Sequence, residues 1–172
     1  MSDSPRYLID SNILIEAHRH YYKFNLCPGF WKSLVWLHGQ HRVLSLDKVK
    51  DEITREADEL ATWATTVMPE TGFAVSQEDV VVEWFGKMQV WAQGQVQYTD
   101  AAKEEFAQVA DAWLIAYARA HGLVLVTHEQ YKPDKKKKIP IPNVCRAFDV
   151  KCANTFEMLT ALSIAYEWDV PS

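Results

Sequence analysis

Four acidic side chains follow, or lie close to, apolar segments, and carboxylates at such positions are typical of a metal site. They are Asp10 after YLI, Glu52 after VLSLDKVK, Asp111 in VADAWLIAYA and Glu129 after LVLVTH. A carboxylate just past a buried strand lies at the carboxyl edge of an open α/β sheet, where such folds bind ligands. At about 5 Å and an effective dielectric of about 20, two carboxylates repel by roughly 3 kcal/mol. If all four meet, protonation or a divalent cation must relieve the repulsion.

Each acid also has a simpler interpretation. Asp10 would cap a helix that begins at Ser11, because Asp, Ser and Asn all favour that position. Glu52 flanks an apolar helical stripe that runs through Val49, Ile53 and Leu60. Glu56 lies nearer to the middle of that stripe and is the alternative candidate for the same role. Asp111 would be an exposed residue at the edge of its helix, and Glu129 would simply begin a loop.

The elements around these acids alternate between strand and helix. Strands are predicted at 6–10, 43–46 and 123–127, with short edge strands near Val144 and Val150. Helices are predicted at 11–18, 30–38, from Asp47 through Leu60, from a Ser76–Asp79 capping box to Gly94, at 99–121 and at 154–166. This alternation predicts one domain over residues 1–172, a three-layer α/β/α sandwich with a mostly parallel central sheet.

The ordered motifs DSN, VKDE, ADAWLIAYA and LVTHE resemble the PIN-like nuclease domains, which include the toxin ribonucleases of toxin–antitoxin pairs. Together the motifs span most of the chain. Residues 64–98 carry none of them and are predicted to be a helical insertion. One departure is that the family more often has Asp near the position of Glu129, with His128 beside it as a possible substitute ligand.

The resemblance implies a metal-dependent endoribonuclease. Asp10, Glu52, Asp111 and Glu129 would be both the catalytic residues and the ligands of Mg²⁺ or Mn²⁺, which prefer carboxylate oxygens. RNA phosphodiester bonds would be hydrolysed to 5′-phosphate and 3′-hydroxyl ends. The resemblance also implies a cognate antitoxin protein as partner, and a possible homodimer.

Several residues near the acids are predicted to bind the RNA substrate. They are Asn12, Thr127, Lys132, Lys135 and Lys136, the last three from the basic loop YKPDKKKKIPIPN. This loop would bind phosphates and make RNA binding depend on salt. Residues 19–23 form a second candidate rim, with rings that could stack on bases. A solvated loop with no such role is the alternative interpretation of the lysine run.

Bulk properties limit the remaining function classes. The net charge of −5 gives no overall attraction to nucleic acid, so any RNA contact must be local. The three cysteines lack metal-site spacing and predict a cytoplasmic protein, and no apolar run reaches the roughly 20 residues that span a membrane. The alternative functions are a non-catalytic PIN-like scaffold and an aspartyl-phosphate phosphatase, although Asn12 stands where such phosphatases commonly carry a second acid.

Overall fold

Five short strands form the centre of the fold, and they pair in parallel in the order β3-β2-β1-β4-β5. The computed structural model describes residues 4–171. The strands are β1 (Tyr7–Ile9), β2 (Val43–Leu46), β3 (Phe73–Ala74), β4 (Val124–Val126) and β5 (Cys152–Ala153). Tyr7 of the central strand lies opposite Val43 on one side and Val124 on the other. The predicted parallel α/β/α architecture is confirmed.

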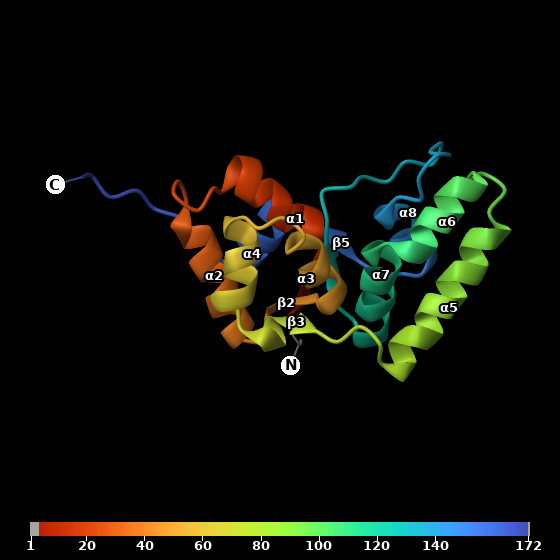
Figure 1. Ribbon diagram of the computed structural model, residues 1–172, viewed down its shortest axis with the longest axis horizontal. Coiled ribbons are helices and arrows are strands. Elements are labelled where there is room, and N and C mark those ends of the chain that lie inside the picture. The colour runs from red at the N-terminus through yellow and green to blue at the C-terminus, as the bar shows by residue number, and fades with distance from the viewer. Residues whose placement is uncertain (1–3, 172) are drawn as a thin grey trace.

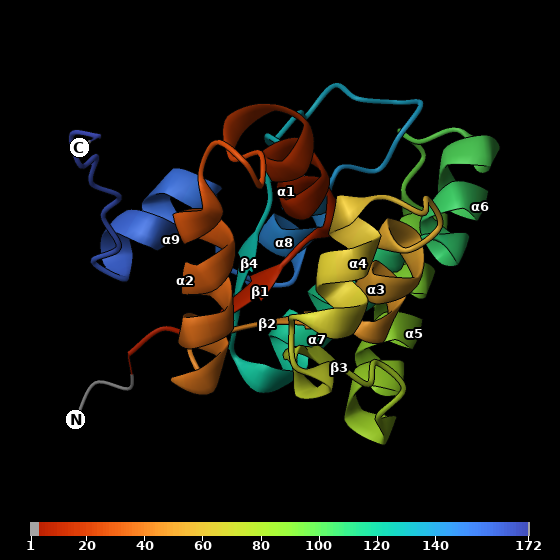
Figure 2. The same cartoon turned by 60° about the vertical axis from the view of Figure 1, so that its left-hand side comes forward.

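Helices cover both faces of this sheet. They are α1 (Ser11–Glu16), α2 (Pro28–Gly39), α3 (Asp47–Ile53), α4 (Glu59–Thr66), α5 (Asp79–Gly94), α6 (Asp100–Gln108), α7 (Ala110–His121), α8 (Ile141–Ala147) and α9 (Thr155–Ala161), with a π-helix at Ala17–Tyr21 and a 3₁₀ turn at Glu70–Gly72. Helices α2 and α7 lie on opposite sides of the strands (Figure 2). Helix α5 packs along the outer side of α7 (Figure 1).

The strands are short apolar runs because both of their faces are covered. Leu8, Leu46 and Leu125 have no exposed surface, as expected for a parallel sheet between helices. The polar exception is Ser45, whose buried hydroxyl donates a hydrogen bond of 2.6 Å to the carbonyl of Ile9. That bond joins β1 and β2 near their carboxyl ends.

Two helices that were predicted to be continuous are each divided in two. The stretch from Asp47 through Leu60 breaks after Ile53, and Asp58 begins α4 by accepting a hydrogen bond of 2.9 Å from the N–H of Ala61. The stretch 99–121 breaks at Val109, whose backbone is extended. Apolar periodicity continues across both breaks, so periodicity alone did not reveal them.

The segment 64–98 was predicted to be a helical insertion, but it is only partly helical. It contains β3, which pairs with β2 and extends the sheet, as well as α5. Helix α5 begins at Asp79 without a side-chain cap, so the predicted capping box is wrong. The N–H of Ser76 instead donates to a carboxylate oxygen of Asp47 at 3.2 Å.

The C-terminal third also differs from the prediction in detail. Val144 lies in α8 and not in a strand, because Pro140 and Pro142 place the chain in a helix start. Val150 lies just before β5. The final helix ends at Ala161, well short of Tyr166. No helix within residues 4–171 combines the length and apolar character needed to cross a membrane.

Candidate functional site

Asp10 lies where β1 ends, and its side chain has no exposed surface. It occupies the N-cap position of α1, but its carboxylate accepts no capping hydrogen bond, so the simpler interpretation of this residue is wrong. The carboxylate instead accepts bonds from the hydroxyls of Ser11 at 3.3 Å and Thr127 at 3.2 Å. Thr127 follows β4, the neighbouring strand. The ends of β1 and β4 thus hold Asp10 at the point where chain connections diverge to opposite sides of the sheet, the usual ligand site of such folds.

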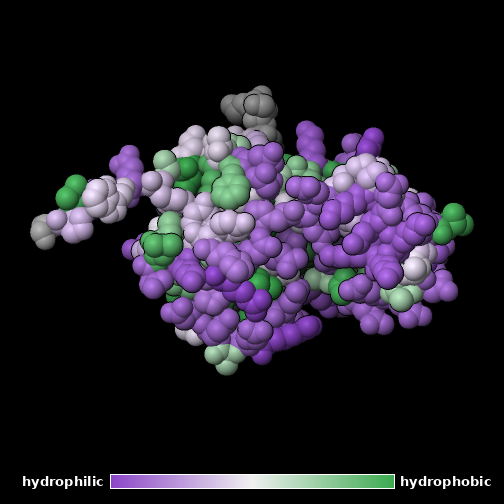
Figure 3. Space-filling model, turned by 90° about the horizontal axis from the view of Figure 1, so that it is seen from above, coloured by the Kyte–Doolittle hydropathy of each residue, from purple (hydrophilic) through white to green (hydrophobic). Residues whose placement is uncertain are grey.

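A pocket of about 460 Å³ adjoins Asp10, and its wall includes Glu52, Asp111 and Asn12. These residues come from three different helices: Glu52 from α3, Asp111 from the first turn of α7 and Asn12 from α1. The pocket lies near the carboxyl ends of the strands, because its wall includes Ser11 and Lys48, which closely follow β1 and β2. Helix α1, which follows β1, lies on the upper side of the molecule in Figure 1. Viewed from above, that side of the molecule is mostly hydrophilic (Figure 3).

The acidic side chains repel one another electrostatically. Burial, followed by the charge of Glu129, raises the pKa of Asp10 from 3.8 to about 6, with a smaller contribution from Glu52. Burial, followed by the charges of Asp10 and Glu129, raises the pKa of Asp111 from 3.8 to about 7. All four predicted acids therefore belong to one electrostatic group.

The four carboxylates are nevertheless not gathered around a single point. Among residues 4–171, no three side chains of the His, Cys, Asp or Glu type lie close enough together to hold one metal ion. Direct coordination by three of these carboxylates would require side-chain movement. Ligation through water requires less, and Mg²⁺ keeps several waters in most protein sites.

Glu129 has partners for both of its carboxylate oxygens. One oxygen contacts the ammonium of Lys138, and the other accepts a hydrogen bond of 2.9 Å from the N–H of Ile141, at the start of α8. The N–H of Glu129 donates to the hydroxyl of Thr127 at 3.2 Å. Burial acts to lower the pKa of Lys138, but the contact with Glu129 and the charge of Asp111 raise it overall. Lys138 is therefore a cation within the acidic site.

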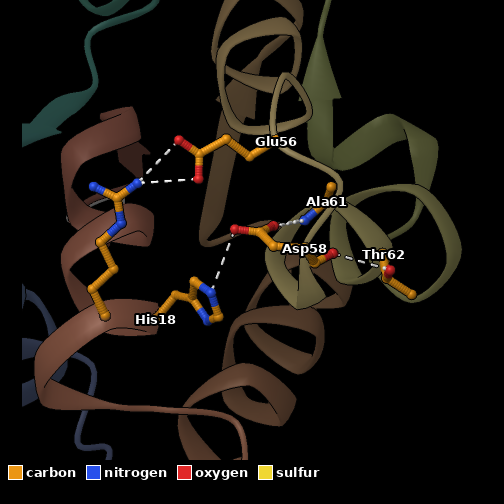
Figure 4. A network of polar contacts seen from close by, with 6 residues as sticks. His18, Glu56, Asp58, Ala61 and Thr62 are labelled. Carbon is orange, nitrogen blue, oxygen red and sulfur yellow. Dashed lines mark hydrogen bonds and ion pairs between the residues drawn. The ribbon is translucent and has the colours of Figure 1, made fainter.

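The structure distinguishes Glu52 from its rival. Glu56 is exposed and forms an ion pair of 3.3 Å with Arg19, away from the pocket (Figure 4). In the same network Asp58 contacts His18 at 3.5 Å. Glu52 lines the pocket and its charge acts on Asp10. Of the two, only Glu52 is placed to join the acidic site.

His128 lies beside the site but faces another group of residues. Its ring nitrogen is 3.1 Å from the hydroxyl of Thr155 and 3.8 Å from Glu16. In the rim at 19–23, Tyr21 is exposed and packs edge-on against Phe156, at 6.0 Å between ring centroids. About half of the surface of Tyr21 remains exposed, and none of residues 19–23 lines the main pocket.

The basic loop runs from β4 over the top of the molecule, passes the turn before α6 and returns to α8 (Figure 1). The carbonyl of Lys136 accepts a bond of 3.0 Å from the N–H of Thr99, and that of Lys135 accepts one of 2.7 Å from the side chain of Gln97. Their ammonium groups are exposed. Lys132, Lys135 and Lys138 line a second pocket of about 260 Å³. The main chain of the loop is thus anchored while its charges face solvent.

Two cationic residues of the pocket were missed in the sequence. Lys48 and Arg55 both line it with Glu52. A helical spacing was the available signal, because Lys48 precedes Glu52 by four positions and Arg55 follows it by three. The ammonium of Lys48 lies 5.7 Å from the centre of the Trp113 ring. The wall of the pocket therefore carries both signs of charge.

The comparison with protein families gives one match that covers most of the chain. The model of the family described as Domain of unknown function (DUF4411) matches residues 7–166. The chain belongs to this family. The matched span includes all five strands and every acidic residue discussed above. No curated protein matches the chain.

Proposed function

We propose that this protein is a PIN-like, metal-dependent endoribonuclease. The observation that carries the proposal is the state of Asp10. It is completely buried at the end of the central strand, its carboxylate accepts no capping hydrogen bond, and its charge interacts with those of Glu52, Asp111 and Glu129. A buried negative charge of this kind is costly for a fold that has no use for it. A cation-binding role accounts for its retention.

The chemistry of the side chains fits a hard divalent ion. Asp10, Glu52 and Asp111 offer carboxylate oxygens, which Mg²⁺ and Mn²⁺ prefer. Burial first, and neighbouring carboxylates second, raise the pKa values of Asp10 and Asp111, and a bound cation would oppose both effects. An ion bound there would supply a Lewis acid for a phosphodiester and favour deprotonation of water near neutral pH.

The protein's own groups would hold and orient the RNA. Ser11 and Thr127 fix the carboxylate of Asp10 through their hydroxyls. Asn12, on the wall of the pocket, can donate its amide N–H to a phosphate or sugar oxygen. Lys132, Lys135 and Lys136 would neutralise phosphates of the strand on either side of the cleaved bond.

The resemblance to toxin ribonucleases extends the proposal to a biological role. The protein would act in the cytoplasm as the toxin of a type II toxin–antitoxin pair, neutralised by a cognate antitoxin protein, with a homodimer as the possible assembly. Its three cysteines are free thiols, which suits a reducing compartment. A small open reading frame next to its gene would be the expected source of the antitoxin.

A non-catalytic RNA- or protein-binding scaffold is the second candidate function. The separation of the carboxylates favours it, since no three of them are within reach of one ion in residues 4–171. Titration with Mn²⁺ by calorimetry separates the two functions. A nuclease should bind Mn²⁺ and lose that binding in Asp10→Asn. A scaffold should show no Mn²⁺ binding that depends on Asp10.

The test of the enzyme is incubation of purified protein with mixed RNAs, with Mn²⁺ or with a chelator. We expect cleavage that needs the ion and falls at least about 100-fold in Asp10→Asn, because the cation that would stabilise the developing negative charge loses a ligand. Glu56→Gln is the matched control: it removes a carboxylate from the adjoining chain segment but outside the pocket. Equal cleavage in chelator, or equal cleavage by Asp10→Asn, would remove the assignment.

A further inference from the structure

The acidic site contains a cation of its own. Lys138 lines both the acidic pocket and the smaller pocket of the basic loop, so it stands where the two meet. Its ammonium contacts Glu129, and the charges of Asp111 and Asp10 also act on it. The neighbouring Lys135 and Lys136 are exposed, whereas Lys138 is partly buried. Lys138 is thus distinct from the rest of the lysine run.

Glu129 is bound to protein groups on both sides. Lys138 takes one oxygen and the N–H of Ile141 takes the other. To become a direct metal ligand, Glu129 would have to give up one of these partners. Releasing the first would leave a partly buried ammonium unpaired, and releasing the second would leave an N–H at the start of α8 without its acceptor. Both losses oppose a role for Glu129 in coordination.

The other three acids have no such cationic partner. Within residues 4–171, Asp10 accepts bonds from two hydroxyls only, and neither Glu52 nor Asp111 forms an ion pair. Lys48 and Arg55 also line the 460 Å³ pocket, but in the described part of the chain neither forms an ion pair with these three acids. Lys138 is therefore the cation of the pocket wall that is paired with one of the four carboxylates.

We propose that Lys138 is the resident counter-ion of the site and that Glu129 holds Lys138 and not the metal ion. A divalent ion would then be held by Asp10, Glu52 and Asp111 in part through bound waters, because no three carboxylates within residues 4–171 lie close enough for direct coordination. This inference rests on the proposed function, and it assigns to Glu129 a positioning role in place of the ligand role that the family resemblance implies. The ammonium of Lys138 stays near the ion and restrains the affinity of the site for it.

Three variants test this assignment through Mn²⁺ affinity, measured by calorimetry and by the electron paramagnetic resonance signal of free Mn²⁺. Lys138→Met removes the counter-ion and should bind Mn²⁺ at least about tenfold more tightly. Glu129→Gln leaves Lys138 unpaired and should bind it more weakly. The double variant restores the original net charge, and its affinity should lie within about threefold of wild type. The Gln carbonyl can still accept the N–H of Ile141, so α8 keeps its acceptor.

Lys137→Met is the matched control, because it removes an exposed charge from the adjacent position of the loop. Its Mn²⁺ affinity should change less than about twofold, as salt screens a solvated charge. A double variant at least tenfold weaker than wild type would make Glu129 a ligand and overturn this inference alone. Absence of Mn²⁺ binding by both wild type and Lys138→Met would overturn the proposed function as well. Circular dichroism of each variant confirms that it is folded.

Discussion

Two single residues, Asp111 and Asp10, carry largely buried carboxyl groups whose charged forms are unfavourable in the folded protein. Both have pKa values raised from 3.8, Asp111 to about 7 and Asp10 to about 6, with burial as the largest cause. The folded state therefore binds protons that the unfolded state releases. Their contribution favours folding below about pH 4 and is lost as the pH rises through about 6 and 7. Near neutral pH these residues destabilise the metal-free protein.

Replacing Asp111 by Asn should therefore stabilise the metal-free protein at pH 8. The gain is at most about 4 kcal/mol, the value for a pKa that moves from 3.8 to about 7. It should shrink to less than about 1 kcal/mol near pH 4, where the carboxyl is protonated in the folded state and about half protonated in the unfolded state. Urea denaturation of the two proteins in chelator, at several pH values from 4 to 8, measures the difference in free energy of unfolding.

Asp100→Asn is the control for this prediction. Asp100 is likewise in the first turn of a helix, α6, but it is exposed. Its loss removes only a favourable interaction with the helix dipole, so the free energy of unfolding should fall by up to about 1 kcal/mol. A lower free energy of unfolding for Asp111→Asn at pH 8 would contradict the inference that burial and neighbouring carboxylates destabilise the charged form of Asp111.

The placement of the site depends on where elements end. Helices α3 and α7 each begin near the carboxyl edge of the sheet, which brings Glu52 and Asp111 to the same pocket. The break before Asp58 turns the chain away from α3, so that Glu56 pairs with Arg19 (Figure 4). At the other end of α7, Gly122 has a φ of 64° and lets the chain enter β4 directly.

Gly122→Ala should lower the free energy of unfolding by about 1–2 kcal/mol, because a Cβ is disfavoured in the left-handed region. Gly86→Ala, in the exposed interior of α5, is the matched substitution and should raise it by up to about 1 kcal/mol. An added Cβ meets no heavy atom within 4 Å at either position, so only the backbone conformation differs. Urea denaturation measures the free energy of unfolding of both variants. If both substitutions changed it in the same direction, the conformational argument would be contradicted.

At the scale of the whole molecule, charge is distributed unevenly. The chain carries a net charge of −5, yet an exposed group of lysines lies between β4 and α8, next to the acidic pocket. A polyanion would be repelled by most of the surface and attracted by this loop. The mostly hydrophilic face that Figure 3 shows is therefore the face on which RNA binding is expected.

Replacing Lys132, Lys135 and Lys136 together by Gln should weaken RNA binding and reduce its salt dependence. If each lysine neutralises one phosphate of a single strand, the slope of log affinity against log salt should fall in magnitude by about 2. Binding is measured by fluorescence anisotropy in the Asp10→Asn background, so that RNA is not cleaved. The same change at the exposed Lys32, Lys87 and Lys151 is the control and should leave the slope nearly unchanged. An unaltered slope in the loop variant would exclude the loop from the RNA interface.

The sequence by itself determined the three central strands, β1, β2 and β4, and the acids that follow β1 and β4. Apolar runs such as YLI and VLV form strands, and a strand end is a local feature, so Asp10 and Thr127 were predicted at the sheet edge and lie there. The parallel α/β class followed from the alternation of elements, and it is confirmed. These features depend on residues close together in the chain.

Only the tertiary structure decided which distant side chains meet. The pairing of Glu129 with Lys138, the choice of Glu52 over Glu56, and the pairing of β3 with β2 all depend on how the elements pack. A periodic pattern shows which face of a helix is buried, but not which way a long charged side chain points or where an extended segment finds an unpaired edge. Those outcomes are set by packing between segments far apart in the chain, which the local pattern does not encode.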